Sequence, residues 1–297
     1  MKRLVILCAI SAFVLAGWFS LPLLVNPQPE VLSVSAGEGN VSRGAYLARA
    51  SGCIACHTDV AANGKPLAGG AALKTPFGDF YAPNLTTDAE HGMGSWTLAQ
   101  FSTAVRQGIS PEGRPYYPAF PYSFYTKLSD QDIADLWAAF QTVPAVNEPS
   151  TEHKLSFPFN LREGLALWQR LFFKEGRFVA PVSDDERYAR GAYWVESASH
   201  CAACHTPRNF LGALDNSRAL AGSEALLEGE GSVPAINAEA LKAAGWTLSD
   251  LSYALQSGLK PDGDVFGGSM GEVVREGTSF MQKADLDAIA FYLLNRR

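Results

Sequence analysis

Four of the five cysteines stand in two copies of one short pattern, Cys-x-x-Cys-His. The copies are Cys53-Ile-Ala-Cys56-His57 and Cys201-Ala-Ala-Cys204-His205. Two thiols on one helical turn can form thioethers with both vinyl groups of one porphyrin, and the adjacent imidazole can then reach the iron. We therefore predict two covalently bound haem c groups, held by the four thiols, with His57 and His205 as axial ligands of the irons.

Two other uses of paired cysteines fit the chain less well. A zinc site made of two Cys-x-x-Cys pairs needs them roughly 15–20 residues apart, whereas Cys56 and Cys201 are 145 positions apart. A redox dithiol would account for the two cysteines of each pair but not for the histidine that follows them. The haem interpretation accounts for the thiols and the histidines together.

The second copy also offers a sixth ligand for its iron. Met270 lies 66 positions after Cys204, in the sequence Gly-Gly-Ser-Met-Gly. A methionine thioether in such a loop can reach the open face of a haem and raise its reduction potential. We predict Met270 as the second axial ligand of the second haem.

The first copy lacks a methionine at the matching place. A gapless alignment puts Phe120 opposite Met270, and phenylalanine has no donor atom. Met93, between two glycines, is a tentative sixth ligand of the first haem. His91 is another candidate, and an iron with an open sixth position is a third possibility. The sequence leaves these alternatives open.

Both motifs belong to an internal repeat, which indicates how they are positioned. The matching blocks are residues 43–58 with 190–206 and residues 96–120 with 246–270. The first pair has one residue inserted before Cys201, and the second pair has eight identities without a gap. Apolar residues in the second pair, and near 133–140 and 286–293, follow the period of an amphipathic helix. No useful alternating strand pattern is found, so we expect an all-α fold.

Local signals mark the ends of several expected helices. Ser129-x-x-Asp132 resembles a capping box at the start of the helix over residues 133–140. Gly108 and Gly258 stand where a residue in the left-handed conformation commonly ends a helix.

The repeat and the proline-rich stretches divide the chain into five segments. These are a signal anchor or transmembrane helix (1–28), a tether (29–41), a first domain (42–143), a connector (144–185) and a second domain (186–297). The connector carries an apolar helical patch from Leu165 to Phe173. We expect it to pack between the domains, because Trp168 and residues 171–173 would otherwise lie in water.

The N-terminus has the features of a membrane anchor. Lys2 and Arg3 precede an uncharged run of 22 residues from Leu4 to Val25. A helix of that length spans about 33 Å, enough for the hydrocarbon core, and no clear small-x-small cleavage site follows. The positive-inside rule places Lys2 and Arg3 in the cytoplasm and the bulk of the chain outside it. A cleaved signal peptide is the alternative.

Composition excludes several other classes of protein. With 47% hydrophobic and 18% charged residues among 297, a long disordered chain is excluded. The formal net charge of −6 gives no basic footprint for nucleic acid, so we expect no nucleic-acid partner. Five cysteines are too few for a disulfide-built scaffold.

With these residues in place, the chain resembles the multihaem cytochrome c subunits of membrane-bound dehydrogenases, such as bacterial alcohol and gluconate dehydrogenases. The matching stretches include RGAYLARASGCIACHT, PLAGG, TPFGDFYAPNLTTD, YPAFPY, KLSDQDI, SFPFNLR, HCAACHTPR and GGSMGEVV. They run from about residue 42 to residue 297. The resemblance implies two tandem class I cytochrome c domains.

The resemblance also implies partners. It implies electron flow from the catalytic subunit of a dehydrogenase (flavin, quinoprotein or molybdenum type) towards a quinone, another cytochrome or an oxidase. This chain departs from the family in two ways. The family usually carries three haems, whereas this chain has two attachment motifs. Where the family has Ala-Met-Pro-Tyr, this chain has Ala119-Phe120-Pro121-Tyr122, so phenylalanine replaces methionine.

Three functions remain in view. The first is a membrane-anchored electron carrier with no catalytic residue of its own, in which the protein sets the haem potentials. The second is a dihaem enzyme acting on peroxide or a sulfur compound at an open first haem. The third is a haem-based sensor, although no signalling module follows the repeat.

Overall fold

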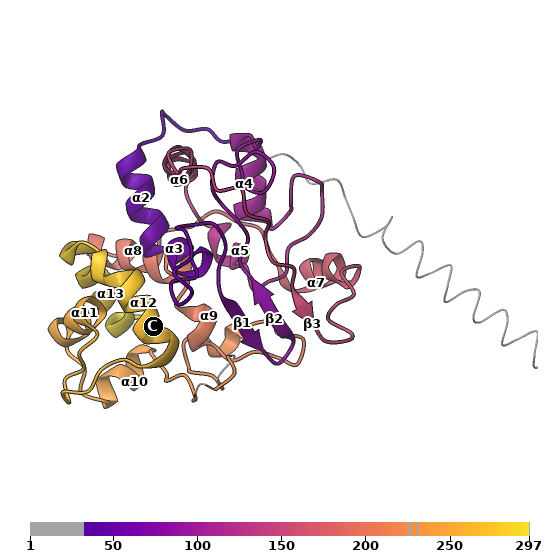
Figure 1. The fold of residues 1–297 in the computed structure, drawn as a ribbon. Helices are drawn as coiled ribbons and strands as arrows, with labels where there is room; N and C mark the ends of the chain where they lie inside the picture. Colours follow the sequence, from indigo (N-terminus) through magenta and orange to yellow (C-terminus); the bar gives the residue numbers. More distant parts are fainter. Residues whose placement is uncertain (1–32, 225–226, 230, 297) are drawn as a thin grey trace, which may run out of the picture.

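The computed structural model describes residues 33–224, 227–229 and 231–296 (Figure 1). Within these ranges, no helix combines the length and apolar character needed to cross a membrane. The predicted anchor from Leu4 to Val25 lies outside the described residues.

The first half of the chain is mainly helical and contains one short hairpin. Its elements are α2 (Val41–Ala50), α3 (Cys53–His57), β1 (Ala72–Thr75), β2 (Gly78–Tyr81), α4 (Leu98–Gln107), α5 (Tyr122–Tyr125) and α6 (Asp130–Phe140). The connector adds β3 (Lys154–Leu155) and α7 (Gly164–Phe172).

The second half is helical over the residues described. Its elements are α8 (Glu186–Tyr193), the π-helix η1 (Trp194–Ala198), α9 (Ala202–His205), the 3₁₀ turn η2 (Asn216–Arg218), α10 (Ala238–Ala243), α11 (Leu248–Ser257), α12 (Gly268–Glu276), the 3₁₀ turn η3 (Thr278–Phe280) and α13 (Lys283–Asn295).

The expectation of a purely helical fold is wrong at one place. Strands β1, β2 and β3 form a small antiparallel sheet in that order. The strands of this hairpin have four residues each, too few for a clear alternating pattern. Gly78 allows the tight turn, since its φ of 118° is costly for other residues. The fold is therefore mostly helical.

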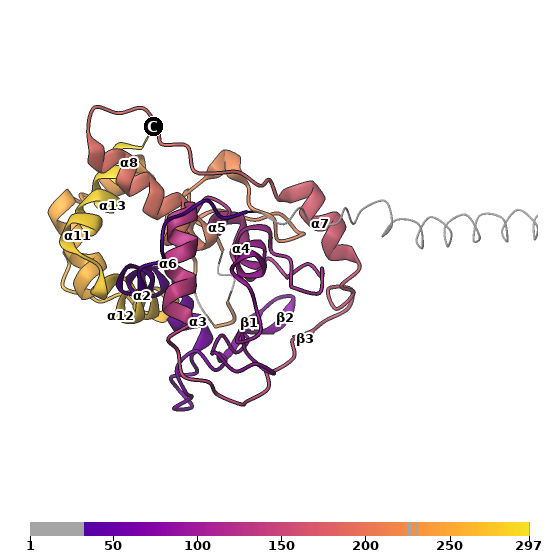
Figure 2. The same cartoon turned by 90° about the horizontal axis from the view of Figure 1, so that it is seen from above.

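The same helix pair recurs in both halves. Helix α2 packs on α6, and α8 packs on α13, as both views show (Figures 1 and 2). The crossings are close because a glycine lies at each: a Cβ on Gly44 would stand 1.8 Å from the Asp135 carbonyl oxygen. On Gly191 it would stand 2.0 Å from the Ala288 carbonyl oxygen. Repeated sequence thus gives repeated packing.

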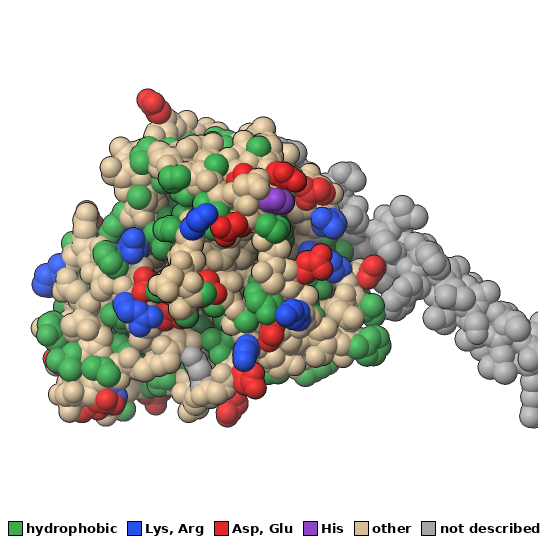
Figure 3. Space-filling view, in the orientation of Figure 1, with side chains coloured by type: hydrophobic (Ala, Val, Ile, Leu, Met, Phe, Trp, Pro, Cys, Tyr) green, Lys and Arg blue, Asp and Glu red, His purple; other side chains and the backbone are tan. Residues whose placement is uncertain are grey.

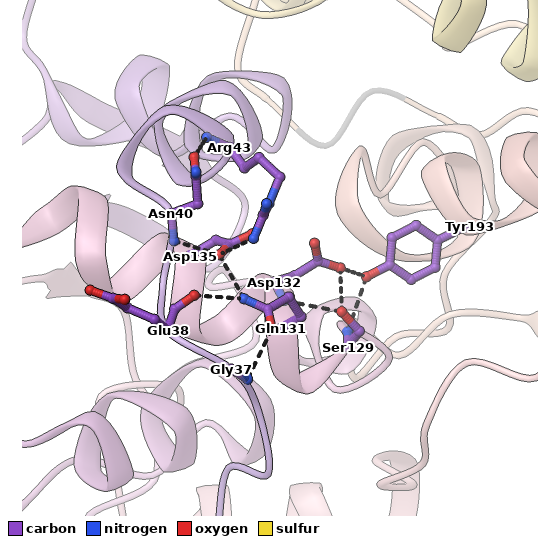
Figure 4. A network of polar contacts seen from close by, with 9 residues as sticks. All are labelled: Gly37, Glu38, Asn40, Arg43, Ser129, Gln131, Asp132, Asp135 and Tyr193. Carbon is purple, nitrogen blue, oxygen red and sulfur yellow. Dashed lines mark hydrogen bonds and ion pairs between the residues drawn. The ribbon is translucent and has the colours of Figure 1, made fainter.

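An ion pair accompanies each crossing. Arg43 Nε lies 2.7 Å from Asp135 Oδ2, whose side chain is almost fully buried (Figure 4). In the second half, Arg190 Nε lies 2.7 Å from Asp285 Oδ1. These arginines open the repeated Arg-Gly-Ala-Tyr sequence, so one short block supplies both the close crossing and its ion pair.

The expected helix ends are confirmed. The Asp132 backbone N–H donates to the Ser129 hydroxyl at 3.0 Å. Gly108 and Gly258 end α4 and α11 in the left-handed conformation, with φ of 64° and 79°. These signals are local and therefore readable from the sequence.

The two halves share one continuous core rather than two separate ones. Buried residues of the first half, such as Leu47 and Ile133, belong to the same cluster as Val195 and Ile289 of the second. Across the boundary, the Arg49 guanidinium lies 4.1 Å from the centre of the Phe280 ring. The arrangement of one half relative to the other is thus fixed by packing.

The connector helix forms where it was predicted, but its burial was overestimated. Helix α7 covers nearly the whole predicted patch, and Leu165 is its one buried side chain. Leu171 is 62% exposed and Phe172 38% exposed, so the expectation that they are packed between the halves is wrong. Trp168 does reach the second half, donating from Nε1 to the Leu211 carbonyl at 2.9 Å. The helix lies on the periphery of the molecule (Figures 1 and 2).

Candidate haem sites

The first Cys-x-x-Cys-His motif forms a short helix of its own. Helix α3 follows α2 after a sharp turn at Gly52, whose φ is 76°. Both thiols are free of disulfide bonds. They border a cavity, yet burial in the surrounding protein raises the pKa of Cys53 to about 12 and that of Cys56 to about 11. The thiols are therefore protonated at neutral pH, and neither is held in a disulfide.

His57 is held in one orientation. Its Nδ1 lies 2.7 Å from the Pro83 carbonyl oxygen. A carbonyl only accepts hydrogen bonds, so Nδ1 carries the proton and Nε2 keeps its lone pair. Burial lowers the pKa of His57 to about 4, which keeps the ring neutral. This is the state in which an imidazole ligates iron, with the carbonyl fixing its tautomer.

The second motif repeats this arrangement. His205 Nδ1 lies 2.8 Å from the Pro234 carbonyl oxygen. The four residues of α9 present Cys204 and His205, with Cys201 just before them. Burial raises the pKa of Cys201 to about 12 and lowers the pKa of His205. Both motifs therefore offer two thiols outside any disulfide and one oriented imidazole.

The residue inserted before Cys201 is absorbed by a π turn. The first half runs from α2 directly to Gly52, whereas the second half continues α8 into η1. There the Ser199 backbone N–H donates to the Trp194 carbonyl, five residues back, at 2.8 Å. A π turn accommodates one extra residue in a helix. His200 then takes the left-handed conformation (φ 38°) at the position that Gly52 has in the first half.

A second pair of supports was missed in the sequence. Leu67 and Leu220 both have positive φ, at 60° and 63°. Their N–H groups donate to the hydroxyls of Thr58 and Thr206, each at 3.0 Å. Each threonine directly follows the histidine of its motif, so the paired loops clamp the end of each motif helix. The repeated Leu-Ala-Gly at 67–69 and 220–222 was the available signal.

The loops that carry Phe120 and Met270 are built alike. The Tyr116 N–H donates to the Gly108 carbonyl at 2.7 Å, and the Phe266 N–H donates to the Gly258 carbonyl at 2.9 Å. Phe120 lies four residues after Tyr116, and Met270 lies four residues after Phe266. Met270 lies half-buried in the first turn of α12, so the expectation that it stands in a loop is wrong. The structure therefore supports the gapless alignment of the two residues.

Met93 lies deep in the core. It is 3% exposed, and its N–H donates to the Thr86 carbonyl at 2.8 Å. His91 stands two residues earlier, with its backbone N–H bonded to Asp88 Oδ1 at 2.7 Å. Both residues border the cavity described next.

One large cavity joins the two motifs. Its volume is about 3960 Å³, against roughly 300–1,000 Å³ for a site that holds one small ligand. Its lining includes both Cys-x-x-Cys-His motifs, Phe120 and Met270. Helix α12, which carries Met270, also packs against α3 of the first motif. The two sites are therefore neighbours.

A buried polar junction lies between the motifs. The Ser51 carbonyl accepts a hydrogen bond from the Tyr125 hydroxyl at 2.6 Å, and His200 Nε2 approaches it at 3.3 Å. The rings of Tyr125 and His200 are 5.6 Å apart. Ser51 precedes the first motif and His200 precedes the second, so this junction connects the starts of the two motifs.

The residues fit covalent haem c at both motifs. Each site combines two thiols outside any disulfide, a neutral imidazole whose Nε2 keeps its lone pair, and a largely apolar cavity. A sequence profile for the cytochrome c family matches residues 41–140.

Relatives cover the rest of the chain. A diheme cytochrome c-type protein of Cereibacter sphaeroides is 42% identical over 93% of this chain and 91% of its own length. The cytochrome c subunit of a quinone alcohol dehydrogenase of Gluconacetobacter polyoxogenes is 37% identical over 85% of this chain and 55% of its own length. The gluconate 2-dehydrogenase cytochrome c subunit of Pantoea cypripedii is 36% identical over 87% of this chain and 60% of its own length.

The chain spans somewhat over half of each dehydrogenase subunit, but almost all of the diheme protein. The motif geometry and these similarities agree. The chain belongs to the cytochrome c family, together with the diheme c-type cytochromes and the cytochrome c subunits of alcohol and gluconate dehydrogenases.

Proposed function

We propose that this protein is an electron carrier with two covalently bound haem c groups. The observation that carries the proposal is the single cavity onto which both motifs open, each with an oriented neutral imidazole. When bound, haem c supplies an iron that cycles between Fe(II) and Fe(III). Two such groups held at sites that border one cavity would let an electron received at one site pass to the other.

The protein's own residues hold and tune these groups. The four motif cysteines anchor them, and His57 and His205 bind iron through Nε2. The Pro83 and Pro234 carbonyls fix the tautomer of each histidine, a contact that tunes ligand basicity. Met270 is the sixth ligand at the second site, where a thioether raises the reduction potential.

The repeat defines two haem domains in tandem. They comprise residues 42–143 and 186–297, joined by the connector 144–185 and preceded by a tether at 29–41. Support comes from the recurring helix crossings at Gly44 and Gly191 and from the matched histidine–carbonyl contacts.

A dehydrogenase is the proposed electron donor, because several relatives are named as cytochrome subunits of dehydrogenases. Its catalytic subunit would be of the flavin, quinoprotein or molybdenum type, and the acceptor a quinone, another cytochrome or an oxidase. Positive and negative side chains are interspersed on the face seen in Figure 3, so docking there does not depend on a patch of one sign. The N-terminal run would anchor the protein on the periplasmic side of the inner membrane.

The test begins with the full chain matured in a periplasm that attaches haem. We expect a mass equal to the chain plus two haems, and rapid reduction of both by a substrate-reduced alcohol or gluconate dehydrogenase. The double variant Cys53→Ala/Cys56→Ala should carry one haem, and Cys201→Ala/Cys204→Ala the other. A mass equal to that of the bare chain would overturn the proposal.

A second candidate is a dihaem enzyme acting on peroxide or a sulfur compound. The observation that favours it is Phe120, which stands where the second half has Met270. Turnover of either substrate by the haem-loaded protein would support this function. If neither substrate is turned over, electron transfer is the proposed function that stands.

A further inference from the structure

Met93 corresponds in structure to an apolar residue of the second half. The Trp96 N–H donates to the Met93 carbonyl at 3.0 Å, and the Trp246 N–H donates to the Leu241 carbonyl at 3.0 Å. Each tryptophan begins the same matched block of the repeat. Met93 and Leu241 are both buried, at 3% and 4% exposure. By this contact Met93 corresponds to Leu241, although it lies three residues before its tryptophan and Leu241 lies five before.

This place belongs to the loop that holds the histidine, rather than to the loop of the sixth ligand. Met93 lies in the segment that begins at Pro83, whose carbonyl orients His57. Leu241 likewise follows Pro234, the partner of His205. In the second half Leu241 is present in addition to Met270, which comes from a different segment, helix α12. The equivalence makes Met93 a packing residue.

Phe120 fills the position of the sixth ligand in the first half. The hydrogen bonds of Tyr116 and Phe266 fix the register of the two loops four residues earlier. The Phe120 ring is held among tyrosines, with ring centres 5.9 Å from Tyr116 and 5.8 Å from Tyr125. A phenyl ring offers no lone pair to iron.

We infer that the first haem site has an open distal position beneath Phe120, which binds a small uncharged diatomic ligand such as CO or NO in the ferrous state. The aromatic surroundings favour an uncharged ligand, since an anion would be desolvated there. This inference rests on haem being attached at both motifs, as proposed above. It assigns different tasks to the two sites: exchange of a ligand at the first, and electron transfer alone at the second.

The test is a CO titration of the reduced, full-length protein, whose two haems are first verified by mass. We expect one CO per chain, and one methionine-to-iron charge-transfer band per chain in the ferric spectrum. Phe120→Met should abolish CO binding and double the intensity of that band. Phe120→Leu, the matched control, should retain one CO per chain.

Two further variants address the other candidate ligands. Met93→Leu and His91→Gln should each leave both the CO stoichiometry and the charge-transfer band unchanged. A protein that carries two haems and accepts electrons but binds no CO overturns this inference alone, as does one that binds two CO per chain. A second CO gained by Met93→Leu or His91→Gln would identify that residue as a ligand and also overturn it. These variants decide the question even if Phe120→Met does not fold.

Discussion

Tyr46, in the first half, donates a hydrogen bond from its hydroxyl to Asp285 Oδ2, at the start of the last helix of the second half, at 2.6 Å. The same hydroxyl accepts the Gln282 backbone N–H at 3.1 Å. Gln282 is the N-cap residue of α13, and its side chain makes no capping bond. Tyr46 therefore supplies a cap to a helix that belongs to the other half of the molecule.

The reciprocal contact is also present. The Tyr193 hydroxyl donates to Asp132 Oδ2 and accepts the Ser129 backbone N–H at the start of α6 (Figure 4). Tyr46 and Tyr193 end the two copies of Arg-Gly-Ala-Tyr, and Asp132 and Asp285 each lie three residues after the N-cap of a last helix. The halves thus exchange equivalent tyrosines, as the subunits of a two-fold symmetric dimer would.

Removal of either tyrosine hydroxyl should weaken the contact between the halves. We expect Tyr46→Phe and Tyr193→Phe each to lower the free energy of unfolding by about 1.5–3 kcal/mol, the usual value for a hydrogen bond to a charged group. Urea unfolding of the haem-loaded protein measures the change. Tyr253→Phe, at an exposed position, is the control and should change nothing. Equal stability of all three variants would contradict the capping role.

The carboxylate of Asp285 should make stability depend on pH. Burial by itself raises the pKa of this group, but hydrogen bonds from Arg190 and Tyr46 lower it below its ordinary value. The stabilisation is then fully present above the unfolded pKa of about 3.9 and is lost as the pH falls through the lower, folded pKa.

The matching experiment compares Asp285→Asn with the parent protein by thermal unfolding between pH 7 and pH 3. The variant should be less stable at neutral pH by about 1–3 kcal/mol, since it leaves Arg190 without a charged partner. The difference should begin to narrow below about pH 3.9, where the carboxyl of the unfolded chain takes up a proton that the folded carboxylate does not yet bind. Asp262→Asn, an exposed control, should match the parent throughout. A difference that stays constant with pH would contradict the assignment.

Features that depend on a few neighbouring residues could be predicted from sequence. The motif positions, the Ser129 cap and the left-handed ends at Gly108 and Gly258 follow from local patterns, and all the helix ends among them are confirmed. The one-residue insertion before Cys201 was visible, but not the π turn that absorbs it. Which hydrogen bond takes up an extra residue depends on the packing of the whole helix.

Other features depend on contacts between distant segments. The Pro83 carbonyl lies 26 positions from His57, and neither residue type reveals the bond. The exposed side of α7 was mistaken for a buried one, because an apolar stripe does not say whether a partner element covers it. A comparison of Leu67 with Leu220 would have revealed the clamp, since the surrounding Leu-Ala-Gly is repeated.

The close helix crossings predict that alanine destabilises the protein at Gly44 and Gly191 but not at an exposed helical glycine. At Gly44 and Gly191 a new methyl group would overlap a backbone carbonyl that cannot move away without separating the helices. We expect Gly44→Ala and Gly191→Ala each to lower the free energy of unfolding by about 1–3 kcal/mol or more. Gly164 lies in α7, and a Cβ added there would have no neighbour within 4 Å. Gly164→Ala should therefore leave the free energy of unfolding unchanged or raise it slightly. Unchanged unfolding of the first two variants would show that the helices separate easily.

Loss of the Met270 thioether should lower the reduction potential of one haem and leave that of the other unchanged. Met270→Leu keeps the volume of the side chain nearly constant but removes the donor atom, so the reduction potential of one haem should fall on the order of 0.1 V, within the range of about 0.8 V that axial ligands span. Spectroelectrochemical titration of the full chain measures both potentials. Met281→Leu replaces a methionine that is 3% exposed in the core and should leave both potentials unchanged. If Met270→Leu also leaves both potentials unchanged, another residue ligates the second iron.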